Sequence, residues 1–132
     1  MEAQSSLSLS ELDAIGKEIV DSAFKVHKAL GPGLLESIYE TCMVYELTKR
    51  GLKVRRQVEV PLFYDGVKLE TPLRVDLLVV EQVIVEIKAV EKMINLYEAQ
   101  LLSYLRLTNC RLGFLINFHV PLIKDGIKRM ML

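Results

Sequence analysis

The chain has 132 residues with 17 basic and 17 acidic side chains, so its formal net charge is zero. A neutral chain excludes a histone-like protein that binds nucleic acid through bulk positive charge. Hydrophobic residues make up 51% and charged residues 26%, which is a globular composition. Because a chain of this length can bury one sizeable core, we expect a single domain over residues 10–132, preceded by a loose tail at 1–9.

The apolar runs and the cysteines indicate where in the cell the protein is located. The longest apolar runs, such as Leu77–Val80, are much shorter than the ~18 residues that a membrane span needs. No basic region followed by an apolar stretch opens the chain, so no secretory signal is expected. Cys42 and Cys110 have no second Cys or His at metal-ligand spacing, which favours reduced, buried thiols. These features predict a cytoplasmic protein with no membrane partner.

Two helices are predicted in the first 50 residues. Ser10 is the expected N-cap of a helix that ends at Leu30, because the following Gly31–Pro32–Gly33 cannot continue helical hydrogen bonding. A second helix is predicted from Leu34 to Arg50, with Gly51 as its terminator. The apolar stripe expected to be buried on this helix comprises Leu35, Ile38, Tyr39, Cys42 and Met43.

Strands follow from residue 53. A β-type run over 54–64, with valines at 54, 58 and 60, leads into Asp65–Gly66, a hairpin turn before Val67–Leu69. Two β-rich runs, 73–80 and 83–90, are separated only by Glu81–Gln82 and are expected to be antiparallel neighbours. Asn95 is the expected cap of a helix over 96–107, followed by strands at 114–116, entered through Leu112–Gly113, and at 127–132. Two helices, four strands, a helix and two strands predict an α/β fold.

Three charged side chains interrupt otherwise apolar strands: Asp76 in one run, and Glu86 and Lys88 in the next. Such positions are costly unless the charge is paired or bound to a cation. Strand alternation places Glu86 and Lys88 on one face. An odd loop or a bulge between the strands would place Asp76 opposite Glu86 with Cβ atoms ~5 Å apart, whereas a two-residue turn would place Asp76 opposite Ile87.

Two carboxylates at that spacing favour a hard divalent cation. Mg²⁺ is the natural choice for an all-oxygen site, with Mn²⁺ as a substitute, and the carbonyl of Ile87 is a candidate third ligand. Lys88 would then orient a phosphate or help to activate water. A cross-strand ion pair between Lys88 and a carboxylate on a half-exposed sheet produces the same pattern and is the alternative.

The motifs resemble known families. Asp76, then Glu86-x-Lys88 on the next strand and a helix, resembles the core of the PD-(D/E)XK nuclease superfamily, with Val75 at the usual Pro position. Gln100 and Tyr104 resemble the Q-x-x-x-Y motif of its RecB-like exonuclease branch. Residues 33–39, Gly-Leu-Leu-Glu-Ser-Ile-Tyr, match the signature of the GxxExxY protein family. The resemblance extends from about residue 13 to the last residues of the chain.

The resemblance implies a restriction-endonuclease-like fold, with a mixed central sheet flanked by helices and two N-terminal helices. Asp76 and Glu86 would be metal ligands, Glu36 the helical acid and a candidate further ligand, and Lys88 the catalytic lysine. It also implies that Gln100 and Tyr104 line the site. The residues alone equally allow Glu36 to be a routine helix-start acid, and Gln100 and Tyr104 to be a helix-surface pair. Tyr39 is expected in the core.

The leading functional hypothesis is a Mg²⁺-dependent phosphodiesterase that acts on DNA. Its rival is a catalytically silent nuclease-fold module, for which a homodimer or a partner protein would supply the missing binding surface. An RNA substrate is a third option, and the sequence leaves exonuclease and endonuclease action open. A cation bound by the acids would neutralise them locally, so a neutral chain can still attract a phosphate.

Overall fold

The computed structural model describes residues 6–132, so the first five residues of the predicted tail lie outside the described part. Helix α1 (Leu9–Leu30) begins earlier than expected because Ser8, and not Ser10, is its N-cap. The Ser8 hydroxyl accepts the N–H of Glu11 at 3.1 Å, and the Glu11 carboxylate accepts the N–H of Ser8 at 3.0 Å. This reciprocal capping box satisfies two donors at the helix start.

Helix α2 (Glu36–Lys49) buries part of the predicted stripe: Tyr39 and Met43 are fully buried and Cys42 packs against the core. Leu35 and Ile38 are 72% and 39% exposed, so their assignment to the core was wrong. Glu40 and Glu46 lie on the buried face, together with Tyr39, Met43 and Leu47. Glu46 tolerates this position because Lys25 lies 3.2 Å from its carboxylate. A pattern that counts only apolar residues misses acids that are buried through such partners.

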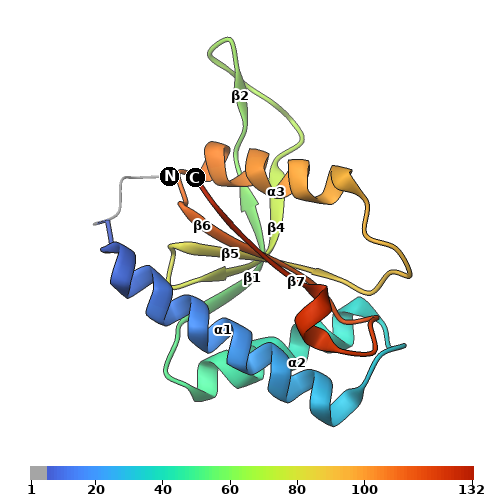
Figure 1. Ribbon diagram of the computed structural model, residues 1–132. Coiled ribbons are helices and arrows are strands. Elements are labelled where there is room, and N and C mark those ends of the chain that lie inside the picture. Colours follow the sequence, from blue (N-terminus) through green and yellow to red (C-terminus); the bar gives the residue numbers. More distant parts are fainter. Residues whose placement is uncertain (1–5) are drawn as a thin grey trace.

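Five strands form the central sheet in the order β1-β4-β5-β6-β7 (Figure 1). Their bounds are β1 (Val54–Val60), β4 (Leu73–Val79), β5 (Val83–Lys88), β6 (Leu112–Asn117) and β7 (Ile127–Met131). Strands β5 and β6 are parallel and the other neighbours are antiparallel. Helix α3 (Asn95–Thr108) joins the parallel pair, as a crossover requires. The predicted α/β class, with a mixed sheet and two N-terminal helices, is confirmed.

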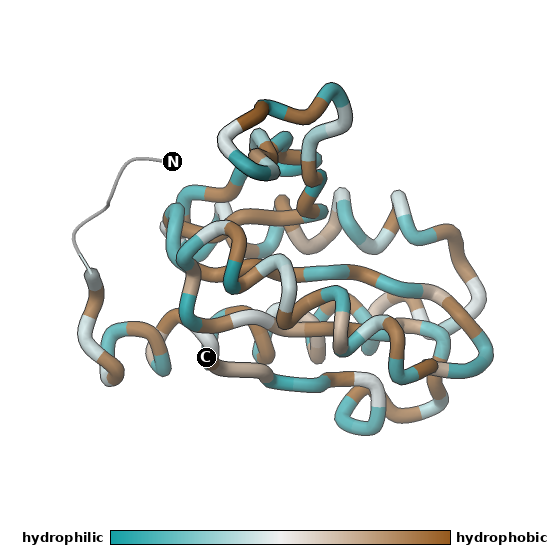
Figure 2. Tube along the Cα trace, turned by 90° about the horizontal axis from the view of Figure 1, so that it is seen from above, coloured by the Kyte–Doolittle hydropathy of each residue, from teal (hydrophilic) through white to brown (hydrophobic). Residues whose placement is uncertain are grey.

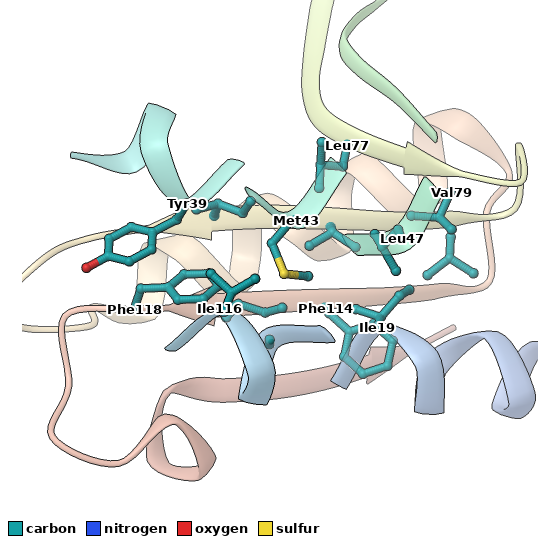
Figure 3. Close-up of a cluster of buried hydrophobic side chains, with 14 of the residues drawn as sticks. Ile19, Tyr39, Met43, Leu47, Leu77, Val79, Phe114, Ile116 and Phe118 are labelled. Atoms are coloured by element: carbon teal, nitrogen blue, oxygen red, sulfur yellow. The ribbon is translucent and has the colours of Figure 1, made fainter. Parts of the chain in front are cut away.

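Helices cover both faces of this sheet, with α1 and α2 on one side and α3 on the other (Figure 1). On the α1–α2 side the ring of Tyr39 stacks on Phe118 with centroids 4.5 Å apart, next to Met43 (Figure 3). On the α3 side, Leu101 and Leu105 pack against the sheet. Residues 83–87 of β5 are therefore buried whichever way they point, and Glu86 is removed from water.

The expected strand over 54–64 is broken at Pro61–Leu62 into β1 and β2 (Phe63–Tyr64). Strand β2 pairs with β3 (Val67–Lys68) in a separate two-stranded sheet, whose turn has Asp65 and Gly66 at φ 54° and 77°. The predicted hairpin is thus confirmed. It stands away from the layers, with hydrophobic stretches along it (Figures 1 and 2). Four of its large apolar side chains are 41–75% exposed: Phe63, Tyr64, Val67 and Leu69.

Other helix and strand boundaries differ by a few residues from those predicted from the sequence. Asn95 is the first residue of α3, and Ile94 occupies the N-cap position without a side-chain hydrogen bond. Strand β5 ends at Lys88, and a short 3-10 helix (Ile123–Gly126) precedes β7. Both cysteines are free thiols. None of the helices in residues 6–132 has the length and apolar character needed to cross a membrane.

Candidate active site

The loop between β4 and β5 decides which residues face each other. It contains three residues, 80–82, and its first two, Val80 and Glu81, adopt φ of 47° and 59°. The register on either side pairs Leu77 with Val85. Extending that register by one residue places Asp76 opposite Glu86. The odd loop, one of the two arrangements that would place the acids opposite each other, is therefore present in place of a two-residue turn.

Beyond Leu77 the two acids take over the hydrogen bonding between β4 and β5. The N–H of Asp76 donates to Oε2 of Glu86 at 2.8 Å, and the N–H of Ile87 donates to Oδ2 of Asp76 at 2.8 Å. The main-chain pairing of β4 with β5 covers residues 77–79 and 83–85. Each carboxylate is thus fixed by the backbone of the opposite strand, and the two acids are held beside one another.

Burial and a neighbouring negative charge disfavour the charged form of both acids. Glu86 is 4% exposed, and burial, with the charge of Asp76 added, raises its pKa to about 8. Burial also raises the pKa of Asp76, although the hydrogen bond from Ile87 opposes the change. A divalent cation beside the two acids would stabilise their charged forms.

Lys88 ends β5 at the same end of the sheet. Its ammonium lies 4.5 Å from the ring centroid of Tyr97 on α3, a residue that the sequence analysis had not singled out. Within residues 6–132 no ion pair involves Lys88, so the cross-strand pair considered as an alternative is not formed there. The positive charge of Lys88 opposes the rise in the pKa of both acids, although burial outweighs it.

Asn117 fixes the backbone that follows Lys88. Its Oδ1 accepts the N–H of Val90 at 3.1 Å, and its Nδ2 donates to the carbonyl of Val90 at 2.9 Å. The carbonyl of Lys88 also accepts the N–H of Phe118 at 2.9 Å. Asn117 is 1% exposed, so these bonds are shielded from water. The segment that carries the lysine is therefore tied firmly to β6.

The start of α2 reaches the same end of the sheet. Oε2 of Glu36 accepts the N–H of Ala89 at 3.3 Å. Tyr39 is fully buried, as expected, and its hydroxyl donates to the carbonyl of Gly31 at 2.6 Å and accepts the N–H of Leu34 at 3.1 Å. Tyr39 therefore holds the loop that precedes α2, and with it the position of Glu36.

Gln100 and Tyr104 come from α3, on the other face. Burial and the charges of Glu86 and Asp76 raise the pKa of Tyr104, so its hydroxyl lies in the field of the acids. Gln100 precedes Tyr104 by four residues, on the same side of the helix, and is half-buried. The charges of the two acids thus act on the Tyr104 hydroxyl. Gln100 lies one turn before Tyr104 on α3, and no hydrogen bond between Gln100 and the acids is formed among the described residues.

Two further residues at the site were missed in the sequence. Glu40 is 7% exposed and accepts Nε2 of Gln57 at 2.7 Å. Gln57 also donates to Oδ1 of Asp76 at 3.3 Å. These residues share a cleft of about 230 Å³ lined by Glu36, Ser37, Glu40, Gln57, Asp76 and Ile87. The four-residue spacing from Glu36 could have indicated Glu40, since it places both on one helix face; no pattern pointed to Gln57.

The donors suit a hard divalent cation. The carboxylates of Asp76 and Glu86 and the carbonyl of Ile87 offer oxygen donors, and Mg²⁺ commonly binds through one or two carboxylates while keeping several waters. In the described part of the chain no group of three or more Asp, Glu, His or Cys side chains could enclose a metal ion. Glu36 is therefore not part of a preformed cage. A buried Glu86 and a half-buried Asp76, both with raised pKa values, fit a cation completed by water.

Comparison with known proteins agrees with this arrangement. The family model described as the PD-(D/E)XK nuclease superfamily matches residues 13–130. The chain belongs to the PD-(D/E)XK nuclease superfamily. Its mixed five-stranded sheet with flanking helices is consistent with the restriction-endonuclease-like fold of PD-(D/E)XK proteins, and membership indicates a nuclease of a class that generally uses divalent metals. No curated protein and no solved structure matches the chain.

Proposed function

We propose that this PD-(D/E)XK protein is a Mg²⁺-dependent phosphodiesterase that hydrolyses the DNA backbone. The observation that carries the proposal is the exchange of hydrogen bonds in which Asp76 and Glu86 each bind the backbone of the opposite strand, with Lys88 two residues further on. The Gly33–Tyr39 segment and the Gln100/Tyr104 pair support placement in the GxxExxY family and the RecB-like branch. In this proposal residues 10–132 act as one domain.

Asp76, Glu86 and the carbonyl of Ile87 would hold the cation, with Glu36 as the candidate further ligand and Mn²⁺ as a substitute ion. When bound, the ion would polarise the phosphoryl group and lower the pKa of a bound water. The two acids are already held in place by backbone N–H groups. Little rearrangement of these side chains would therefore be needed for binding.

Lys88 and two side chains of α3 would act on the substrate. The ammonium of Lys88 would bind a phosphate oxygen and stabilise the negative charge that develops on it in the transition state. The raised pKa of Tyr104 keeps its hydroxyl protonated, so this group would donate a hydrogen bond to the phosphate. Gln100, one turn earlier, would contact the neighbouring nucleotide through its amide.

The test is a nuclease assay on linear, nicked, branched and single-stranded DNA and on RNA, with Mg²⁺ or with EDTA. We expect metal-dependent DNA hydrolysis that falls by about 10²–10³-fold in Lys88→Ala, because a charge that stabilises the transition state is lost. Glu86→Gln should be inactive, because the amide cannot replace the carboxylate as a ligand of the cation. The matched controls are Lys92→Ala and Glu59→Gln, both exposed residues outside the site.

Full activity in both Lys88→Ala and Glu86→Gln would contradict the proposed site. Absence of hydrolysis on every substrate, together with no Mg²⁺- or Mn²⁺-dependent thermal shift, would favour a catalytically silent module that works with a partner protein or as a homodimer. Hydrolysis of RNA alone would keep the site and change the substrate class.

A further inference from the structure

Gln57 interrupts the pairing of β1 with β4 directly beside Asp76. The register joins Arg56 with Leu77 and Val58 with Val75, and no pair is formed between Gln57 and Asp76. Gln57 has φ of 51°, a left-handed conformation that residues other than glycine rarely adopt. The break in the ladder and the unusual backbone therefore coincide at the neighbour of a proposed metal ligand.

This backbone turn changes which face the residues of β1 occupy. Val54 packs into the core on the α1–α2 side, whereas Val58 and Val60 pack into the core on the α3 side. In a regular strand these three residues would share one face. The switch at Gln57 lets two consecutive side chains, Arg56 and Gln57, reach Glu40 of α2. The side chain of Gln57 is thereby directed to the acids.

We propose that Gln57 and Glu40 are positioning residues that hold the carboxylate of Asp76 for cation binding, an inference that rests on the proposed function. The amide nitrogen of Gln57 has two hydrogens and contacts one acceptor on each acid, Oε1 of Glu40 at 2.7 Å and Oδ1 of Asp76 at 3.3 Å. Oδ2 of Asp76 accepts the N–H of Ile87. Both oxygens of Asp76 are therefore bound, which fixes the plane of the carboxylate.

Glu40 acts here as an anchor for Gln57 and is itself paired with Arg56. Nη2 of Arg56 donates to Oε2 of Glu40 at 3.1 Å and to the hydroxyl of Thr41 at 3.2 Å. Each carboxylate oxygen of Glu40 thus has its own donor. Partners that orient a metal ligand typically contribute 10–100-fold to metal affinity, and this is the effect expected for Gln57.

The first test measures Mn²⁺ binding through the electron paramagnetic resonance signal of the free ion. Gln57→Gly should bind Mn²⁺ about 10–100-fold more weakly, because the orienting amide is lost. Its thermal midpoint should not fall, since glycine adopts a positive φ without strain. A purely structural role for Gln57 would lower the thermal midpoint, and that result would overturn the inference.

Glu40 is tested by two substitutions and a control. Glu40→Gln keeps an oxygen that accepts from Gln57 and should retain most of the Mn²⁺ affinity, whereas Glu40→Leu should lose as much as Gln57→Gly. Equal losses in the two Glu40 variants would indicate that its charge binds the ion directly, and positioning by Glu40 would be wrong. Glu59→Gln, the same change at an exposed site on β1, should bind Mn²⁺ like the wild type.

A second measurement needs no metal. The N–H of Ile87 is protected by Asp76, so its hydrogen exchange in EDTA should be about 2–10-fold faster in Gln57→Gly, while exchange at Val85 is unchanged. Wild-type exchange at Ile87 and wild-type Mn²⁺ affinity in this variant would overturn the inference even if the proposed nuclease activity holds. Faster exchange in a protein that binds no Mn²⁺ would support positioning and contradict the proposed metal centre.

Discussion

Replacing Glu86 with Gln should change how the stability of the metal-free protein depends on pH. In the folded protein burial and the neighbouring Asp76 raise the pKa of Glu86 to about 8, from an ordinary value of 4.5. Below pH 4.5 the carboxyl is protonated in both the folded and the unfolded chain. Between pH 4.5 and 8 only the unfolded chain releases the proton, so the free energy of unfolding falls as the pH rises.

The size of this effect follows from the two pKa values. Between the two pKa values the free energy of unfolding falls by about 1.4 kcal/mol per pH unit, so the total loss approaches 5 kcal/mol once the pH exceeds 8. Glu86 is 4% exposed, and water therefore does little to screen the penalty. Since a domain of this kind has only about 5–15 kcal/mol of stability, the wild type should be markedly weakened at alkaline pH. Gln carries no charge and avoids this loss.

Urea denaturation of both proteins at pH 5, 7 and 9 in EDTA measures the difference. Glu86→Gln should gain on the wild type by about 4 kcal/mol between pH 5 and 9, because a small part of the loss has already occurred at pH 5. Mg²⁺ should restore part of the wild-type stability at pH 9. Glu59→Gln, an exposed acid on β1, is the control and should follow the wild type. Parallel pH profiles for Glu86→Gln and the wild type would refute the assignment of Glu86 as an acid that is neutral when metal-free.

Two further substitutions test the supports of the site. Gly126→Ala should destabilise the protein by about 3 kcal/mol or more, because a Cβ there would overlap the carbonyl oxygen of Asn117; an unchanged urea midpoint would contradict this packing. Tyr39→Phe keeps the stack on Phe118 but removes the hydroxyl that joins Gly31 and Leu34, and should cost about 1–3 kcal/mol in the same assay. Tyr45→Phe, at a residue that is 67% exposed, should cost nothing measurable and serves as its control.

The facing of Asp76 and Glu86 across the β4–β5 loop is the part of the site that sequence reasoning came closest to. Charged residues in apolar strands are costly, which singled out Asp76 and Glu86. If the two acids lie opposite each other, strand alternation requires an odd loop or a bulge between them. The loop of residues 80–82 meets this requirement. The argument works because strand periodicity is regular and a charge in an apolar run has few explanations.

Glu40 and Gln57 could not be found in the same way. Burial of Glu40 depends on Arg56 and Gln57, which are 16 and 17 residues away in the chain, and no local pattern reports that contact. The left-handed backbone of Gln57 arises where no glycine or asparagine signals it. The start of α1, in contrast, could have been placed from the sequence, because Ser8 has Glu11 three residues later, the spacing of a capping box, whereas Ser10 has no Glu or Gln at that spacing.

The β2–β3 hairpin is a segment that could be replaced without changing the central sheet. Val60 and Leu73 are paired across β1 and β4, so residues 61–72 leave and re-enter the sheet at adjacent positions. Strands β2 and β3 pair only with each other, and the register of the five-stranded sheet does not depend on them. Shortening a loop lowers the entropy lost on folding, so a tight turn could replace this segment. Its tip, Asp65–Gly66, is therefore a position for a label or an inserted domain that leaves the central sheet intact.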